Sequence, residues 1–192
     1  MAGCRAGYRW SGSSEDSRDT RAAVDPTVTA REVCLRLLTV RPRSRAELAD
    51  ALRRRGIGQD VAEPVLDRLT TVGLVDDVAL AETAVHSGHT YRGLGRLGLS
   101  DELRRKGVPD DLARDAVATV RPEDEEQRAR ELVRRSLRSA TTRDEATLAR
   151  RLVVMLARKG YPEELAFCVV RAEVLTATGS DIGMSEAESG SC

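Results

Sequence analysis

The sequence predicts an all-α protein made of three tandem three-helix repeats in an elongated, curved array. Charged residues make up 32% of the 192 residues and aromatic residues only 3%, which is typical of amphipathic helices rather than β-sandwiches. A short motif of basic residues, a glycine and an apolar residue also recurs, with its glycine at Gly56, Gly107 and Gly160. The offsets between these glycines are 51 and 53 residues, as repeated structural units of similar size would give.

Each copy of the motif is typical of the end of one helix and the start of the next. Basic residues stabilise the negative C-terminal end of a helix, and glycine adopts the left-handed conformation that closes its last turn. The apolar residue that follows (Ile57, Val108 or Tyr161) is expected to pack beneath the corner. Pro109 and Pro162 then suit the first turn of the next helix. Leucines extend the register upstream at Leu48, Leu52, Leu99, Leu103, Leu152 and Leu156.

The first repeat is expected at residues 29–77. Residues 29–32 match a capping box, in which a hydroxyl and a carboxylate satisfy free backbone amides at a helix start. A second match at residues 44–47 is expected to begin the next helix. The third helix is expected to run from about Asp60 until Gly73 stops it.

The second repeat is expected at residues 78–121. It follows Asp76 and Asp77, whose carboxylates suit a helix N-terminus. Residues 87–98 contain four glycines that interrupt the helical pattern. Because an interior glycine costs about 1 kcal/mol relative to alanine, this junction is expected to be the softest part of the array and to let the first repeat swing.

The third repeat is expected at residues 122–175. Its first helix opens with acids at residues 123–126, which suit the positive end of a helix dipole. Residues 142–145 match a further capping box before its second helix. The last helix is expected to run from about Glu163 to Leu175.

The composition argues against several classes of function. Lys+Arg and Asp+Glu both number 31, so the net charge predicts no general attraction to nucleic acid. No apolar run has the length of a signal-peptide core or a membrane span, so we expect a cytoplasmic protein with no membrane partner. We also expect a monomer. Residues 1–28 and 176–192 lack an apolar period and are expected to be a disordered N-terminal tail and a flexible C-terminal tail.

The sequence offers no convincing site for catalysis, a cofactor or a metal. Residues 93–98 match G-x-G-x-x-G, but dinucleotide binding needs a preceding strand, and the preceding segment has a helical pattern. Glu82, His86 and His89 could share a helix face, yet Gly88 weakens that helix and no fourth metal ligand is apparent. No nucleophile elbow or Walker motif is present. We therefore expect a protein that is not an enzyme and binds no cofactor or metal.

Basic side chains recur in the turns that precede the glycine motif. In a curved array equivalent positions fall along one edge, where they would form an extended surface for a filamentous partner. The simpler interpretation, that each arginine caps a helix or lies on a solvated face, stays open for any single residue. The candidate partner-binding residues are Arg53, Arg54, Arg92, Arg96, Arg104, Arg105, Lys106, Arg134, Arg135, Arg150, Arg151 and Arg158.

Several segments of the repeats match a known family pattern, namely residues 30–38, 43–48, 52–56, 65–69, the Val-Gly-Leu-Val-Asp-Asp run at 72–77, 101–107 and 150–161. In these segments the chain resembles the RecX family of recombinase regulators. The resemblance spans about residues 29–175 and implies an elongated helical protein lying in the groove of the RecA nucleoprotein filament. It also implies inhibition of the ATPase, strand-exchange and coprotease activities of RecA, within recombination, DNA repair and the SOS response.

One segment departs from the family pattern. Family members usually follow the Asp-Asp pair with Phe-Ala and a later basic helix, whereas this chain has Leu80-Ala81 and then residues 84–89 with two histidines. This change weakens the expectation that this face contacts RecA or DNA. The alternative function is a helix-turn-helix-like DNA-binding module that acts independently of RecA. The near-zero net charge and the lack of a dense basic recognition helix argue against it, so we expect at most a weak direct contact with DNA.

Overall fold

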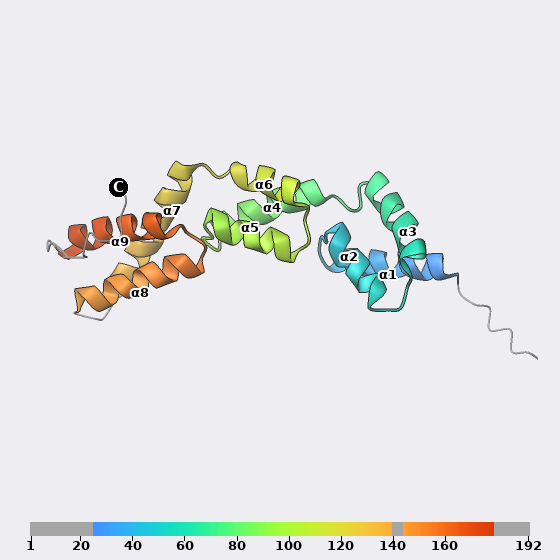
Figure 1. Cartoon of the computed structure of the whole chain (residues 1–192), viewed down its shortest axis with the longest axis horizontal. Helices are drawn as coiled ribbons and strands as arrows, with labels where there is room; N and C mark the ends of the chain where they lie inside the picture. The colour runs from blue at the N-terminus through green and yellow to red at the C-terminus, as the bar shows by residue number, and fades with distance from the viewer. Residues whose placement is uncertain (1–24, 140–143, 179–192) are drawn as a thin grey trace, which may run out of the picture.

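A computed structural model describes residues 25–139 and 144–178, which form an elongated, gently curved row of helices (Figure 1). The described ranges contain helices and no strand. None of their helices is long and apolar enough to cross a membrane. In chain order the helices are α1 (Pro26–Val40), α2 (Arg45–Arg53), α3 (Gln59–Thr71), α4 (Asp77–Thr90), α5 (Arg96–Arg105), α6 (Asp110–Ala118), α7 (Pro122–Arg138), α8 (Glu145–Arg158) and α9 (Glu163–Thr178).

Three separate hydrophobic cores hold these helices in groups of three. Helices α1 and α2 pack with α3 around Leu52 and Leu66, which are fully buried. Helices α4 and α5 pack with α6 around Leu99 and Leu103. Helices α7 and α8 pack with α9 around a third core that includes Leu156. Each group buries its own apolar faces, so the expected fold of three tandem three-helix repeats is confirmed.

The recurring glycine closes the second helix of each repeat. Gly56, Gly107 and Gly160 have φ angles of +76°, +69° and +79°, the left-handed conformation that the motif predicts. The apolar residue after the glycine is buried at Val108 and Tyr161 and half-buried in the first repeat. The amide after each glycine donates to a carbonyl five residues earlier, as in a Schellman motif: Ile57 to Leu52 (3.2 Å), Val108 to Leu103 (3.1 Å) and Tyr161 to Leu156 (3.2 Å).

The helix starts agree in part with the capping boxes expected from the sequence. At the start of α2, Ser44 Oγ accepts from the Glu47 amide (3.0 Å) and the Glu47 carboxylate accepts from the Ser44 amide (3.3 Å), which confirms that box. The box at Thr29 is wrong. Helix α1 begins earlier, at Pro26, because Asp25 already caps it by accepting from the Thr27 amide (2.8 Å).

Two other helix starts rest on aspartates. Asp76 caps α4 by accepting from the Ala79 amide (2.9 Å), as expected. Asp144 caps α8 by accepting from the Thr147 amide (3.2 Å). Thr142, which the sequence suggested for this role, lies outside the described residues. The helices also extend into both expected tails, at residues 26–28 and 176–178, while the remainder of each tail is not described.

The corner of the second repeat docks on the start of α2 in the first repeat. The Ser44 hydroxyl, which is fully buried, donates to the carbonyl of Lys106. The approach is close, because a Cβ on Gly107 would lie 2.5 Å from the Cβ of Ala46. The glycine therefore serves both the turn and the junction between repeats.

The same docking recurs one repeat later. The Gly95 amide donates to the Lys159 carbonyl (2.9 Å), and the Leu97 amide donates to the Gly160 carbonyl (3.2 Å). A Cβ on Gly98 would lie 2.4 Å from the Lys159 carbonyl oxygen. The glycine-rich segment, which the sequence analysis expects to be soft, forms this junction, and its expected softness stays a prediction. Gly95 and Gly98 allow the backbones of the second and third repeats to come into direct contact.

A carboxylate from the next repeat completes each junction. The Arg45 amide at the start of α2 donates to Asp77 (2.9 Å), and the Arg96 amide at the start of α5 donates to Glu125 (2.7 Å). The first amides of a helix have no partner within the helix, so these contacts satisfy donors that would otherwise need water. Helices α2, α5 and α8 consequently lie end to end, with the negative C-terminal end of α5 facing the positive N-terminal end of α2, and that of α8 facing α5.

The second junction has additional contacts. The hydroxyl of Tyr161 donates to the Gly93 carbonyl (3.3 Å), and Lys159 Nζ donates to the Arg92 carbonyl (2.6 Å). Burial raises the pKa of the Tyr161 hydroxyl, which keeps it protonated as a donor. Among the described residues, more hydrogen bonds therefore join the second and third repeats than join the first and second.

Candidate partner-binding surface

Exposed basic turns recur along the long axis of the array. Since α2, α5 and α8 follow head to tail, their last turns lie at successive positions along the molecule (Figure 1). Arg54 marks the free end of the first repeat, Arg105 lies beside the first junction, and Arg158 lies beside the second. All three side chains are exposed, and none has an ion pair among the described residues. The array thus carries a periodic set of unpaired positive charges.

Two further candidates have local partners but remain accessible. Arg53 pairs with Asp50 and Arg104 pairs with Asp101, each at 2.7 Å and three residues apart on one helix. The two arginine side chains are 78% and 74% exposed. Exposed pairs of this kind contribute little to stability, so a partner can replace either aspartate at small cost.

Other candidates form ion pairs within their own repeat. Arg92 forms an ion pair with Glu102 (2.7 Å), and Lys106 Nζ lies 4.0 Å from the same carboxylate. Arg134 donates twice to Glu173 (2.7 and 2.9 Å), which joins α7 to α9 and raises the pKa of the guanidinium. Removal of these side chains would disturb the fold as well as any contact surface.

The remaining candidates lie on three different helices. Arg135 on α7 and Arg150 and Arg151 on α8 are exposed in the third repeat. Arg96 is half-buried at the start of α5 and lines a cavity of about 570 Å³ with Arg114, which was not a candidate. The structure does not gather the candidate residues into one cluster. It distributes them along three repeats.

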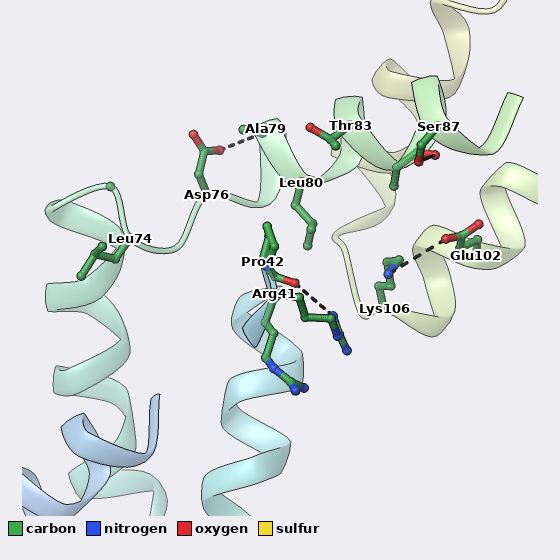
Figure 2. Close-up of a pocket in the computed structure, with 13 residues that line it drawn as sticks. Arg41, Pro42, Leu74, Asp76, Ala79, Leu80, Thr83, Ser87, Glu102 and Lys106 are labelled. Carbon is green, nitrogen blue, oxygen red and sulfur yellow. Dashed lines mark hydrogen bonds and ion pairs between the residues drawn. The ribbon is translucent and has the colours of Figure 1, made fainter. Parts of the chain in front are cut away.

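A second cavity, of about 370 Å³, lies at the first junction (Figure 2). Its walls come from both repeats and include Pro42 and Leu74 from the first and Leu80 from the second. Figure 2 shows Leu80 projecting toward Pro42, with the Glu102–Lys106 pair of α5 nearby. The shape of this cavity therefore depends on how the first repeat is oriented on the second.

The histidine segment of α4 has a structural role in this arrangement. His89 Nδ1 lies 3.0 Å from the Leu94 carbonyl, and the His86 ring packs edge-on against Tyr91 with centroids 6.2 Å apart. Within the described ranges no three histidine, cysteine, aspartate or glutamate side chains are placed to hold a metal ion. The G-x-G-x-x-G match at residues 93–98 spans the end of the α4–α5 loop and the first turn of α5, and it forms part of the second junction.

Several junction residues were missed by the sequence analysis. Ser44 was recognised as a cap but not as a contact to the next repeat, and the roles of Asp77 and Glu125 at the junctions were not foreseen. One feature of the sequence could have indicated these junction contacts. Arg45 and Arg96 lie 51 residues apart, the spacing of the first two glycines, so partners of one helix start could have been sought at the other.

Comparisons with known proteins agree with this architecture. The model of the "RecX, first three-helix domain" matches residues 30–69, and that of the "RecX, second three-helix domain" matches residues 76–117. The chain is 47% identical over 180 residues to the regulatory protein RecX of Thermobifida fusca, covering 91% of this chain and 97% of the relative. It is 50% identical over 145 residues to the regulatory protein RecX of Amycolatopsis mediterranei, covering 76% and 83% respectively.

Solved structures show the same fold. The crystal structure of RecX from Lactobacillus salivarius superposes with a TM-score of 0.69 at 20% sequence identity. The matched region covers 79% of this chain and 98% of that one. A second crystal structure, of a regulatory protein RecX, gives a TM-score of 0.68 at 22% identity, over 76% of this chain and 73% of the other.

Proposed function

This chain belongs to the RecX family, and from that premise we propose that it binds the RecA nucleoprotein filament. It would inhibit the ATPase, strand-exchange and coprotease activities of RecA and so regulate DNA repair and homologous recombination. The observation that carries the proposal is the head-to-tail order of α2, α5 and α8, which spaces exposed basic turns along one elongated molecule. A filament presents its own sites at regular intervals, so a periodic surface is the natural complement.

The docking of each repeat on the previous one supports an inhibitory mechanism. The basic side chains that each repeat offers are mostly exposed, and single exposed ion pairs contribute about 0–1 kcal/mol. Joined in one molecule, the repeats meet successive filament subunits at high effective concentration, so weak contacts combine into firm binding. A molecule that bridges subunits would oppose the relative motion that accompanies nucleotide turnover. We expect it to act in the cytoplasm as a monomer, without catalysis of its own.

Retention on RecA-coated DNA tests this proposal directly. RecA is assembled with a non-hydrolysable ATP analogue on biotinylated single-stranded DNA held on beads, and the full chain is added at physiological salt. Retention is expected only when RecA is present. Equal retention on bare DNA would instead favour the DNA-binding module that acts independently of RecA, and no retention on either would contradict both.

Charge reversal tests the basic turn beside the first junction. Arg104→Glu with Arg105→Glu is expected to weaken retention on the filament about tenfold, since two favourable contacts become repulsive. Arg31→Glu with Arg36→Glu is the matched control, because these arginines are exposed on α1 and lie outside the candidate surface. Equal loss in both double variants would refute a specific role for the α5 turn.

A further inference from the structure

The cavity between α5 and α6 has an unusual charge arrangement when it is compared with the equivalent place in the first repeat. Arg45 and Arg96 are equivalent residues, each the first of its helix and 51 residues apart. In the first repeat Arg45 is neutralised by two acids of α3, Glu63 and Asp67, the latter at 2.7 Å. In the first repeat, the charge of this guanidinium is therefore balanced by acids of the same repeat.

The second repeat lacks both acids. The residues 51 positions after Glu63 and Asp67 are Arg114 and Ala118, and both line the cavity of about 570 Å³ together with Arg96. Arg96 and Arg114 thus line one cavity, together with Arg104, where the first repeat has an ion-paired cluster. Like charges in such an arrangement repel each other unless an anion lies between them.

The Arg96 side chain also lacks a hydrogen-bond acceptor. Its Nε atom is buried, and it donates no hydrogen bond to any described residue. A buried donor without a partner costs free energy comparable to a lost hydrogen bond, so such groups call for an explanation. An acceptor in the cavity, beside Arg96 and Arg114, would supply the missing bond.

Two carboxylates also line this cavity, and neither neutralises the arginines. Glu125 accepts from the backbone amide of Arg96 at the N-terminus of α5. Asp110 is the first residue of α6, where it faces the positive end of that helix. Both acids therefore offset helix dipoles, while the guanidinium groups of Arg96 and Arg114 keep their positive charge.

We propose that this cavity binds the backbone phosphate of a nucleic-acid strand. Guanidinium groups bind phosphate through paired, charge-assisted hydrogen bonds, which a cluster of two arginines provides. The site continues along α5, because Arg96, Ser100 and Arg104 recur at four-residue spacing and all line the cavity. Eight residues of helix span about 12 Å, which exceeds the spacing of successive phosphates and suits a polymer better than a single free anion.

This inference rests on the proposed function, because the RecA filament contains the DNA strand that would bind in the cavity. It can fail separately, because its test uses DNA without RecA. The full chain is titrated against a fluorescein-labelled oligothymidylate at low salt, and binding is followed by fluorescence anisotropy. Arg114→Glu restores the acid found in the first repeat, so it should pair with Arg96, preserve the fold and close the site. Ala118→Asp restores the other acid without altering an arginine.

Arg114→Glu is expected to weaken DNA binding about tenfold and to lower the salt-dependence slope by about one or more. Ala118→Asp should also weaken binding. Arg36→Glu changes the net charge as much as Arg114→Glu does, and Arg36→Gln as much as Ala118→Asp does. Both controls lie outside the cavity and should weaken DNA binding much less. Equal weakening in variants and controls would overturn the site, as would no binding by the unaltered chain. Displacement of the oligonucleotide by inorganic phosphate or ATP at matched phosphate concentration would overturn the assignment to a strand.

Discussion

Gly98 lies inside α5 at the point where the backbone of the third repeat comes closest to the second. A glycine in a helix interior normally reduces stability, and replacing it with alanine gains about 1 kcal/mol. Here a Cβ would lie 2.4 Å from the Lys159 carbonyl oxygen and 3.1 Å from its carbon. These are backbone atoms that cannot rotate away, so steric conflict should outweigh the gain in helix propensity.

Gly98→Ala is therefore expected to destabilise the protein by about 1–3 kcal/mol, the range typical of overpacking. Urea denaturation followed by circular dichroism measures the change. Ser100→Ala, an exposed position in the same helix, is the control and should change stability by no more than about 0.5 kcal/mol. A stabilised Gly98→Ala variant would show that the two repeats do not dock in this way.

The start of α2 depends on an ionised carboxylate. Burial raises the pKa of Glu47, but hydrogen bonds from Arg41 (2.7 and 3.0 Å) and the Ser44 amide outweigh it, so the net pKa lies below its ordinary value. A carboxyl whose folded-state pKa is lowered stabilises the protein above its unfolded-state pKa of about 4.3. This contribution is lost as the pH falls through the lower folded-state value.

Glu47→Gln should therefore cost about 1 kcal/mol at pH 7, because the neutral amide loses the charge-assisted bonds to Arg41. The cost should shrink as the pH falls below about 4, where the native carboxyl also loses its charge. Denaturant titrations of both proteins at pH 7, 5 and 3 measure it. If the difference in free energy of unfolding between the two proteins did not change with pH, the ionised form of Glu47 would contribute nothing to stability.

At the level of helices, the two junctions share a design but differ in strength. In both, the later repeat supplies two contacts to the start of the earlier repeat's second helix. One is its glycine corner, and the other is a carboxylate. The second junction also binds backbone to backbone through Gly95 and Leu97. The first uses the Ser44 side chain instead. The second and third repeats should therefore move together, with the first repeat moving more freely.

Amide hydrogen exchange of the full chain tests this difference. Leu97 and Ala46 occupy equivalent positions 51 residues apart, but only the Leu97 amide has a carbonyl partner, Gly160. Leu97 should therefore exchange at least about tenfold more slowly than Ala46 after correction for intrinsic rates. Equal protection of the two amides would contradict the asymmetry.

Much of this helical organisation could be predicted from local sequence. The three glycine corners and the caps at Ser44 and Asp76 depend on residues within a few positions of one another, so local patterns revealed them. The junctions depend on residues that lie 29 or more positions apart, from Arg96 and Glu125 at 29 positions to Ser44 and Lys106 at 62. The pattern of glycines at 88–98 was therefore read as a break, since no local signal shows that a distant backbone lies against them.

At the scale of the whole molecule, the distribution of charge matters more than its sum. The formal net charge is zero, yet unpaired arginines recur at the ends of α2, α5 and α8. The sequence identified Arg54, Arg105 and Arg158 because they belong to the repeated motif. It could not separate them from Arg92 and Arg134, whose acidic partners come from other helices. It also missed Arg114, which stands outside the motif and gains meaning only beside Arg96.

The central claim is that the array acts on the RecA filament through binding sites linked in one molecule. The most direct measurement is RecA ATPase on single-stranded DNA with the full chain added below the concentration of RecA subunits. We predict inhibition at these sub-stoichiometric levels, since one array contacts several subunits. Unchanged ATP hydrolysis under conditions in which the filament forms would contradict the account.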